Sequence, residues 1–163
     1  MITIVTAADT LYYERLQGLI GSIYKHHADG LNYNNTFRII VYDLGLNEIE
    51  IKVLKTIPGI QVERAEPVNQ HMYSETPSHL IDNPRNVIGW YSWKPVIIKD
   101  ALYRFENILY LDAGITVTNN LLPIWQEIAV HGYFFVGVGD INWINNAIIF
   151  HRQVSNFDRG GAR

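Results

Sequence analysis

The sequence has no cysteine among its 163 residues. This absence excludes a disulfide framework, a thiolate metal site and a cysteine nucleophile together. Charged residues are few, at 18%, while 48% of the residues are apolar, which is typical of a folded globular protein and not of a disordered one. A chain of this length buries one substantial core and is too short for two comfortable domains.

The chain carries little positive charge. Its formal net charge is −3, and its 13 lysine and arginine residues are scattered rather than clustered. Binding to a nucleic-acid backbone requires a basic surface. We therefore expect no nucleic-acid partner.

Long apolar runs and a basic leader are absent as well. Met1 leads directly into a short apolar run at residues 2–6, with no basic segment before it. We therefore expect no signal peptide, no membrane span and a cytoplasmic location.

The glycine-rich loops that commonly hold phosphate are missing too. The sequence has no GxxxxGKS/T segment and no GxGxxG segment after its first apolar run, and Gly137-Val138-Gly139 comes too late and is too short to serve. P-loop chemistry and dinucleotide binding of the Rossmann type are therefore disfavoured.

What the sequence does have is an alternation of short β-branched runs with helical periods. Strands are expected at residues 2–6, 37–42 and 60–66, with helices between them. Parallel neighbouring strands need such crossovers, and helices on both faces explain why the strands are almost continuously apolar. The pattern predicts an α/β domain with a parallel sheet.

The helix after the second strand carries a clear start signal. Asn47, with Glu50 three residues later, resembles a capping box. Ile49, Val53 and Ile57 then form one helical face. A helix is therefore expected between Asn47 and the Pro-Gly pair that follows Ile57.

The second half of the chain is less regular. Residues 67–89 have no convincing period, and a loop of that length in a compact domain is either functional or disordered. Pro95 fits the first position of a helix expected at residues 95–104. Further elements are expected as strands at residues 108–111, 133–138 and 147–150, and as a helix that Asn119 or Asn120 caps and that ends near Gly132. Residues 151–163 are expected to form a loosely held tail after a domain of residues 1–150.

The stretch at residues 105–118 is the first candidate for function. Its apolar strand ends at Asp112 and turns at once through Ala113 and Gly114. In an open α/β sheet, ligands bind beyond the carboxyl ends of the strands, so an acid at that place is a candidate ligand-binding residue. The alternative is that Asp112 only ties down a turn through its own backbone.

Other turns are expected to share the same edge of the sheet. They are residues 6–9, Asp43 to Gly45 and Gly139-Asp140. A cluster of acids there would repel a phosphate unless a divalent cation lay between them. The arrangement therefore suggests a nucleotide diphosphate bridged by a metal ion.

Four segments together resemble the GT-A type glycosyltransferases, and the nearest pattern is that of family-8-like enzymes and related uncharacterised sugar transferases. The segments are residues 5–9, residues 41–46, Trp93-Lys94-Pro95 at the start of a helix, and above all residues 108–114 with the sequence ILYLDAG. In that family a strand of the form LYLDAD or LYLDAG carries the metal motif. The resemblance covers about residues 1 to 140 and implies a three-layer α/β/α fold with a mostly parallel open sheet.

The resemblance also implies an activity and roles for particular residues. It implies transfer of a sugar from a nucleotide diphosphate sugar, with UDP as the expected nucleotide, to an unknown glycan, protein or lipid acceptor. Asp112 would hold Mn²⁺ or Mg²⁺ on the diphosphate, and Lys94 would reach the diphosphate or the donor sugar, so these two are the catalytic candidates. Donor contacts would come from Thr6, Ala7, Ala8 and Asp9 with Tyr12 nearby, from Asp43 beside the base, and from Ala113 and Gly114.

The chain departs from the family pattern at two places. Gly114 stands where the second acid of the D-x-D motif is expected, which leaves metal dependence open. The family usually has a further C-terminal portion with a late histidine ligand, and His151, the late histidine here, is interpreted as a surface or packing residue. A truncated or non-catalytic nucleotide-sugar-binding domain is therefore the alternative. A sugar nucleotidyltransferase is a second one, but it would need a basic glycine-rich loop after the first strand.

Several other side chains have two interpretations. Trp90, Tyr91 and Trp93 are candidates for stacking on a sugar or base, although core packing is favoured. His71 and His79 are candidates for a lid, although a solvated loop is favoured. Two further candidates are Asp140, as an acceptor-side base or a helix cap, and the pair Asn145 and Asn146, as a sugar-contacting turn.

Overall fold

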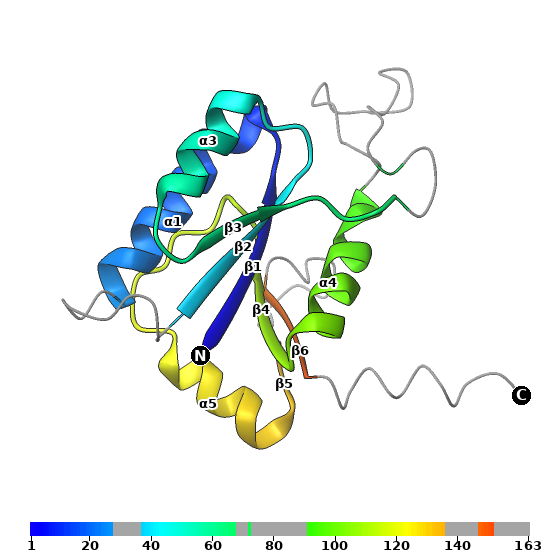
Figure 1. Cartoon of the computed structure of the whole chain (residues 1–163). Helices are drawn as coiled ribbons and strands as arrows, with labels where there is room; N and C mark the ends of the chain where they lie inside the picture. Colours follow the sequence, from blue (N-terminus) through cyan, green and yellow to red (C-terminus); the bar gives the residue numbers. More distant parts are fainter. Residues whose placement is uncertain (28–36, 68–71, 73–90, 136–146, 152–163) are drawn as a thin grey trace, which may run out of the picture.

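The computed structural model describes residues 1–27, 37–67, 72, 91–135 and 147–151 (Figure 1). These residues form a six-stranded sheet with the strand order β3-β2-β1-β4-β6-β5. The strands are β1 (Ile2–Ala8), β2 (Phe37–Asp43), β3 (Ile60–Glu63), β4 (Asn107–Leu111), β5 (Tyr133–Phe135) and β6 (Ala147–His151). Strands β1 to β4 run parallel, and β6 runs antiparallel to both β4 and β5. The expected mostly parallel α/β sheet is confirmed.

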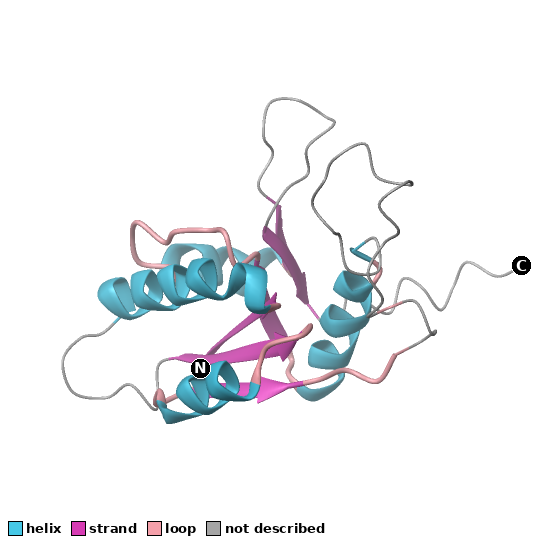
Figure 2. Ribbon diagram, turned by 90° about the horizontal axis from the view of Figure 1, so that it is seen from above, coloured by secondary structure: helices cyan, strands magenta, loops and turns pink. Residues whose placement is uncertain are grey.

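Helices cover both faces of this sheet. They are the 3₁₀ turn η1 (Thr10–Tyr12), α1 (Tyr13–His27), α3 (Glu48–Thr56), α4 (Trp93–Arg104) and α5 (Leu122–His131). Figures 1 and 2 show α1 and α3 on one face and α4 on the opposite face, which gives three layers. Among the described residues, no helix is long and apolar enough to cross a membrane.

The alternation of side chains along each strand divides the core into two parts. Ile4 of β1 and Leu109 of β4 point to the layer of α1, α3 and α5, where they join Leu16 and Leu54. Their strand neighbours, such as Val5 and Tyr110, point to the layer of α4. Successive residues of a strand face opposite sides of the sheet, so each buried strand serves both layers.

Two polar links hold α4 on its face of the sheet. The hydroxyl of Tyr42 in β2 donates a hydrogen bond to Asp100, and Nη2 of Arg104 donates to Glu63 of β3 over 2.6 Å. Burial, followed by the neighbouring Asp100 carboxylate, raises the pKa of Tyr42 above its usual range, so its hydroxyl stays a donor. These links fix the helix that begins with Trp93 and Lys94.

The predicted capping box of α3 is confirmed, since the Asn47 side chain accepts from the Glu50 amide and Glu50 accepts from the Asn47 amide. The predicted helical face is wrong as a packing face at Ile49 and Val53, whereas its third member, Ile57, is partly buried against the core. Ile49 is 73% exposed and Val53 42% exposed, whereas Leu54 is fully buried and Glu50 almost so. Glu50 can face inward because Thr10 and the Asn47 amide satisfy its carboxylate.

Other boundaries differ by a few residues from those expected. Helix α4 begins at Trp93, two residues before Pro95, and β3 ends at Glu63. The N-cap residue of α5 is Leu121, but Asn120 still accepts a hydrogen bond from the Leu122 amide over 2.7 Å. The helix ends at Gly132 as predicted, and the φ of +81° there is a conformation that glycine adopts without strain. Of the tail expected at residues 151–163, His151 instead ends β6, and residues 152–163 lie outside the described residues.

The packing face of α3 can be tested by two truncations on that helix. Leu54→Ala should lower the free energy of unfolding by about 2–5 kcal/mol, because it leaves a cavity in the core. Ile49→Ala, at an exposed position one turn earlier, should change it by less than about 0.5 kcal/mol. Urea denaturation of both variants measures the difference. A loss for Ile49→Ala as large as that for Leu54→Ala, or larger, would contradict the observed packing face.

Candidate functional site

Three of the predicted acids lie at one edge of the sheet. Asp9 follows β1, Asp43 ends β2 and Asp112 follows β4. The register pairs Ala8 with Asp43 and Val5 with Tyr110, so the three strands end at the same side. Parallel strands bring their carboxyl ends to one edge, which is where ligands bind in open α/β sheets. The prediction that these acids share an edge is confirmed.

Asp112 forms a close ion pair with Lys94 of α4. The Lys94 ammonium lies 2.9 Å from Oδ1 and 3.0 Å from Oδ2 of Asp112. The hydroxyl of Tyr110 donates a second hydrogen bond to Oδ1 over 2.6 Å. About a quarter of each charged side chain is exposed, 26% for Lys94 and 23% for Asp112. The two catalytic candidates therefore form one polar unit that is half-buried and open to solvent.

Aromatic rings surround the Lys94 ammonium. Its Nζ lies 5.0 Å from the ring centre of Tyr91, 5.6 Å from that of Trp93 and 5.8 Å from that of Tyr110. Rings within about 6 Å attract a cation through their electron-rich faces. Trp93 is buried in the α4 layer of the core, as the favoured interpretation predicts, whereas Tyr91 is exposed at the edge of the site. Its φ of +61° is uncommon for a residue with a side chain.

Tyr110 acts as a hydrogen-bond donor throughout the neutral pH range. Burial, followed by the charge of Asp112 and the hydrogen bond to it, raises the pKa of Tyr110 above its usual range. The phenol therefore keeps its proton and helps to orient the carboxylate. Sequence reasoning did not single out Tyr110, although it lies two residues before Asp112 and residues i and i+2 of a strand share a face.

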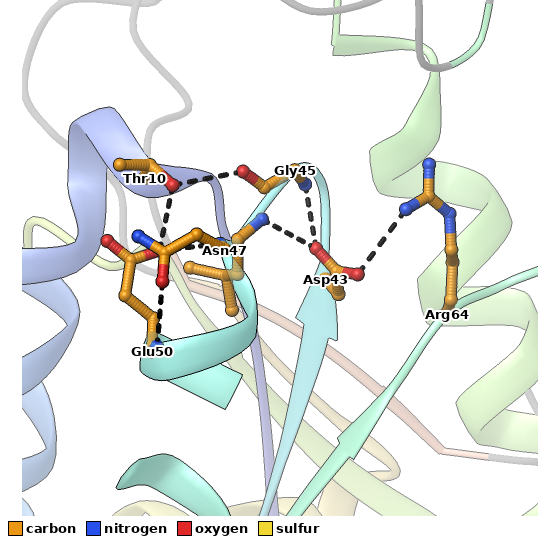
Figure 3. A network of polar contacts seen from close by, with 7 residues as sticks. Thr10, Asp43, Gly45, Asn47, Glu50 and Arg64 are labelled. Carbon is orange, nitrogen blue, oxygen red and sulfur yellow. Dashed lines mark hydrogen bonds and ion pairs between the residues drawn. The ribbon is translucent and has the colours of Figure 1, made fainter. Parts of the chain in front are cut away.

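Asp43 belongs to a second polar network at the same edge (Figure 3). Its Oδ1 accepts hydrogen bonds from the amides of Gly45 over 2.8 Å and Leu46 over 2.7 Å. Its Oδ2 forms an ion pair with Arg64 over 3.3 Å. The Asp43 carboxylate therefore closes the turn after β2. It also holds the positively charged Arg64 side chain at the edge of the sheet.

Thr10 joins the turn after β1 to the turn after β2 (Figure 3). Its Oγ1 lies 2.7 Å from Oε2 of Glu50 and 3.1 Å from the carbonyl oxygen of Gly45. The amide of Leu44 donates to the carbonyl of Ala8 over 3.0 Å. Asp9 accepts from the Tyr12 amide over 3.0 Å and so caps the 3₁₀ turn. The first two turns therefore form one connected surface.

The other predicted donor contacts differ in how far solvent reaches them. Thr6, Ala7 and Ala8 are buried within β1, and the Oγ1 of Thr6 has no hydrogen-bond partner. Asp9 and Tyr12 are partly exposed. Ala113 is buried, and Gly114 is exposed beside Asp112. On the β1 side, Asp9 and Tyr12 are therefore the predicted residues that solvent reaches, and their role as ligand contacts stays a prediction.

The described residues offer a poor metal site. They contain no group of three histidine, aspartate or glutamate side chains that could hold a metal ion. Asp112 stands without a second acid at position 114, and both of its oxygens already contact Lys94. His151 pairs with Asn107 at the start of β4, so about five residues, or roughly 16 Å of strand, separate its backbone from Asp112. The expected Mn²⁺ or Mg²⁺ stays a prediction.

Several other candidates lie outside the described residues. They are His71, His79, Trp90, Asp140, Asn145 and Asn146. Three residues that sequence reasoning did not connect with the site do contribute to its edge: Thr10, Glu50 and Arg64. The capping-box pattern signalled Glu50 but gave no indication that its carboxylate would also reach Thr10.

The fold is shared with solved glycosyltransferases. No protein-family model and no curated protein sequence matches the chain. Among solved structures, the galactosyltransferase LgtC, in complex with donor and acceptor sugar analogs, superposes with a TM-score of 0.57 at 18% identity over 93% of this chain. GlyE of Streptococcus pneumoniae TIGR4 gives 0.60 at 13% over 97%, and TarS of S. aureus gives 0.57 at 14% over 97%.

These likenesses show a GT-A fold, as the sequence resemblance implies. Membership of family 8 in particular stays a prediction. The chain spans 58% of the LgtC chain, 36% of the GlyE chain and 49% of the TarS chain. The similarity therefore shows the fold of this chain, and a glycosyltransferase activity for it is a proposal.

The raised pKa of Tyr110 makes a prediction for alkaline pH. Above the usual phenol value of 10.0, the unfolded chain loses the Tyr110 proton while the folded protein keeps it. Stability is therefore full below pH 10 and falls above it, by about 1.4 kcal/mol per pH unit from this group. Tyr110→Phe should remove this contribution, so its stability falls less steeply between pH 10 and pH 11 in urea unfolding. Identical slopes would contradict the assignment.

Proposed function

We propose that this domain binds the donor of a glycosyltransferase that moves a sugar from a nucleotide diphosphate sugar to an acceptor. The observation that carries the proposal is the Lys94–Asp112 pair at the carboxyl edge of a GT-A sheet. We propose UDP as the nucleotide, on the sequence resemblance. The proposed acceptor is a glycan, a protein or a lipid.

The diphosphate has a favourable place at the start of α4. Lys94 is the second residue of this helix, and Ser92, at the N-cap, makes no side-chain hydrogen bond to the first turn. The positive end of the helix dipole favours anions, and an adjacent ammonium strengthens that preference. In the reaction, Lys94 would stabilise the negative charge that develops on the departing diphosphate. Asp112 and Tyr110 would keep Lys94 in position.

The nucleoside would lie along the turns after β1 and β2. Asp9, Tyr12 and Asp43 line this part of the edge, and Thr10 ties the two turns together. A surface braced in this way changes little when a ligand binds, so less ordering entropy is lost. Arg64 beside Asp43 adds a positive group that a base carbonyl or a phosphate can use.

A second candidate function is nucleotide-sugar binding without transfer. Gly114 stands where the family has the second acid of its motif, and a domain that had lost catalytic activity would show such a replacement. The sugar nucleotidyltransferase alternative is not favoured, because the turn from Ala7 to Asp9 has neither the glycine nor the basic residue that such chemistry needs.

A thermal-shift series with UDP, ADP, GDP and inorganic phosphate tests the proposal. A ligand at 100 times its Kd stabilises the folded state by about 2.7 kcal/mol and so raises the melting temperature. If the site prefers UDP, UDP should raise the melting temperature more than the other ligands do. Release of UDP from UDP-sugars on prolonged incubation should then separate an enzyme from a binding domain. The absence of any shift with any nucleotide would refute the proposal.

A further inference from the structure

We propose that the donor site binds the diphosphate through the Lys94 ammonium and needs no divalent cation. This inference rests on the proposed function, because it concerns how the same site holds its nucleotide. It opposes the expectation of Mn²⁺ or Mg²⁺ that the family resemblance raises. Three observations on Asp112, Gly114 and Lys94 carry it.

The first observation is that Asp112 already has a cation. The ammonium of Lys94 lies within 3.0 Å of both carboxylate oxygens, and the hydroxyl of Tyr110 occupies a further lone pair of Oδ1. A divalent ion at this carboxylate would have to displace Lys94 from a place where three aromatic rings also hold it. The site therefore favours the fixed ammonium over a diffusing ion.

The second observation is the missing acid at position 114. A Cβ atom added there would meet no atom of the described residues within 4 Å, and the φ of Gly114 is not in the left-handed region. Neither the backbone conformation nor contact at Cβ therefore demands the glycine. In the absence of an acid at position 114, the described residues provide no further histidine, aspartate or glutamate that completes a metal site around Asp112.

The third observation concerns charge and reach. Two carboxylates with a divalent ion have no net charge, and one carboxylate with one ammonium likewise has none. Replacing the first set by the second keeps the electrostatic balance that a diphosphate meets. Lys94 has three N–H donors, of which one donates to Oδ2 of Asp112 while the ammonium also lies 2.9 Å from Oδ1, and its side chain is 26% exposed. One donor is therefore left for a phosphate oxygen.

Calorimetric titration of the full chain with UDP, in EDTA and in excess MnCl₂, tests the inference. Wild-type protein should bind UDP in EDTA with a Kd within about threefold of that in MnCl₂. Lys94→Gln should weaken binding in EDTA by about tenfold or more, and Lys94→Arg should largely restore it. Lys99→Gln, which removes an exposed ammonium further along the same helix, is the matched control and should bind as wild type.

Two further variants distinguish a donor site that uses Lys94 from one that depends on a divalent metal ion. Asp112→Asn removes the negative charge near the phosphates but keeps an oxygen for Tyr110, so it should tighten UDP binding in EDTA by about threefold. In MnCl₂, a metal-dependent site would instead lose binding with this change. Gly114→Asp should give the protein a Mn²⁺-dependent thermal shift that wild type lacks. Thermal unfolding of each variant without ligand verifies that it is folded.

The outcomes separate the inference from the proposed function. UDP binding that occurs only with Mn²⁺, or that Asp112→Asn abolishes, overturns the inference and leaves the proposed function intact. Binding by Lys94→Gln equal to wild type in EDTA also overturns it, as does a Gly114→Asp protein with the same Mn²⁺ response as wild type. No UDP binding in either buffer refutes the proposed function and the inference with it.

Discussion

The burial of β1 is the constraint on which the rest of the structure depends. All seven of its residues are buried, because β2 and β4 flank it and helices cover both of its faces. Its register with both neighbours places the ends of β1, β2 and β4 at one edge. The functional edge is therefore a consequence of the core: the strand that fills the centre of the sheet also sets where Asp9, Asp43 and Asp112 come together.

The edge contains two polar units that do different work. Around Thr10 and Asp43, the carboxylates of Glu50 and Asp43 accept hydrogen bonds within the turns, and Asp43 also forms an ion pair with Arg64. These contacts brace this part of the edge. Around Asp112, the carboxylate instead holds Lys94, which belongs to the first turn of α4 and remains partly exposed. The proposed function uses both parts, since it assigns the nucleoside to the braced turns and the phosphates to the accessible cation.

The sequence predicted elements well where one physical rule decided them. The apolar runs of β1 and β2, the capping box of Asn47 and the acid after β4 depend on local pattern, and each is present. The packing face of α3 depended on tertiary context: Ile49 and Val53 look like core residues until Leu54 takes the sheet side. Likewise, no local rule links Lys94 to Asp112, because their contact requires α4 to pack on the particular face where Tyr110 also points.

The division of the core between alternate residues of β1 has a consequence for how this protein can vary. A substitution within the strand affects one layer and can be absorbed by repacking there. Insertion or deletion of a single residue would turn every later side chain to the wrong side, which exchanges the two sets of packing partners at once. Length differences between this chain and other proteins of the same fold should accordingly be confined to the connections, while the central strand keeps a constant residue count.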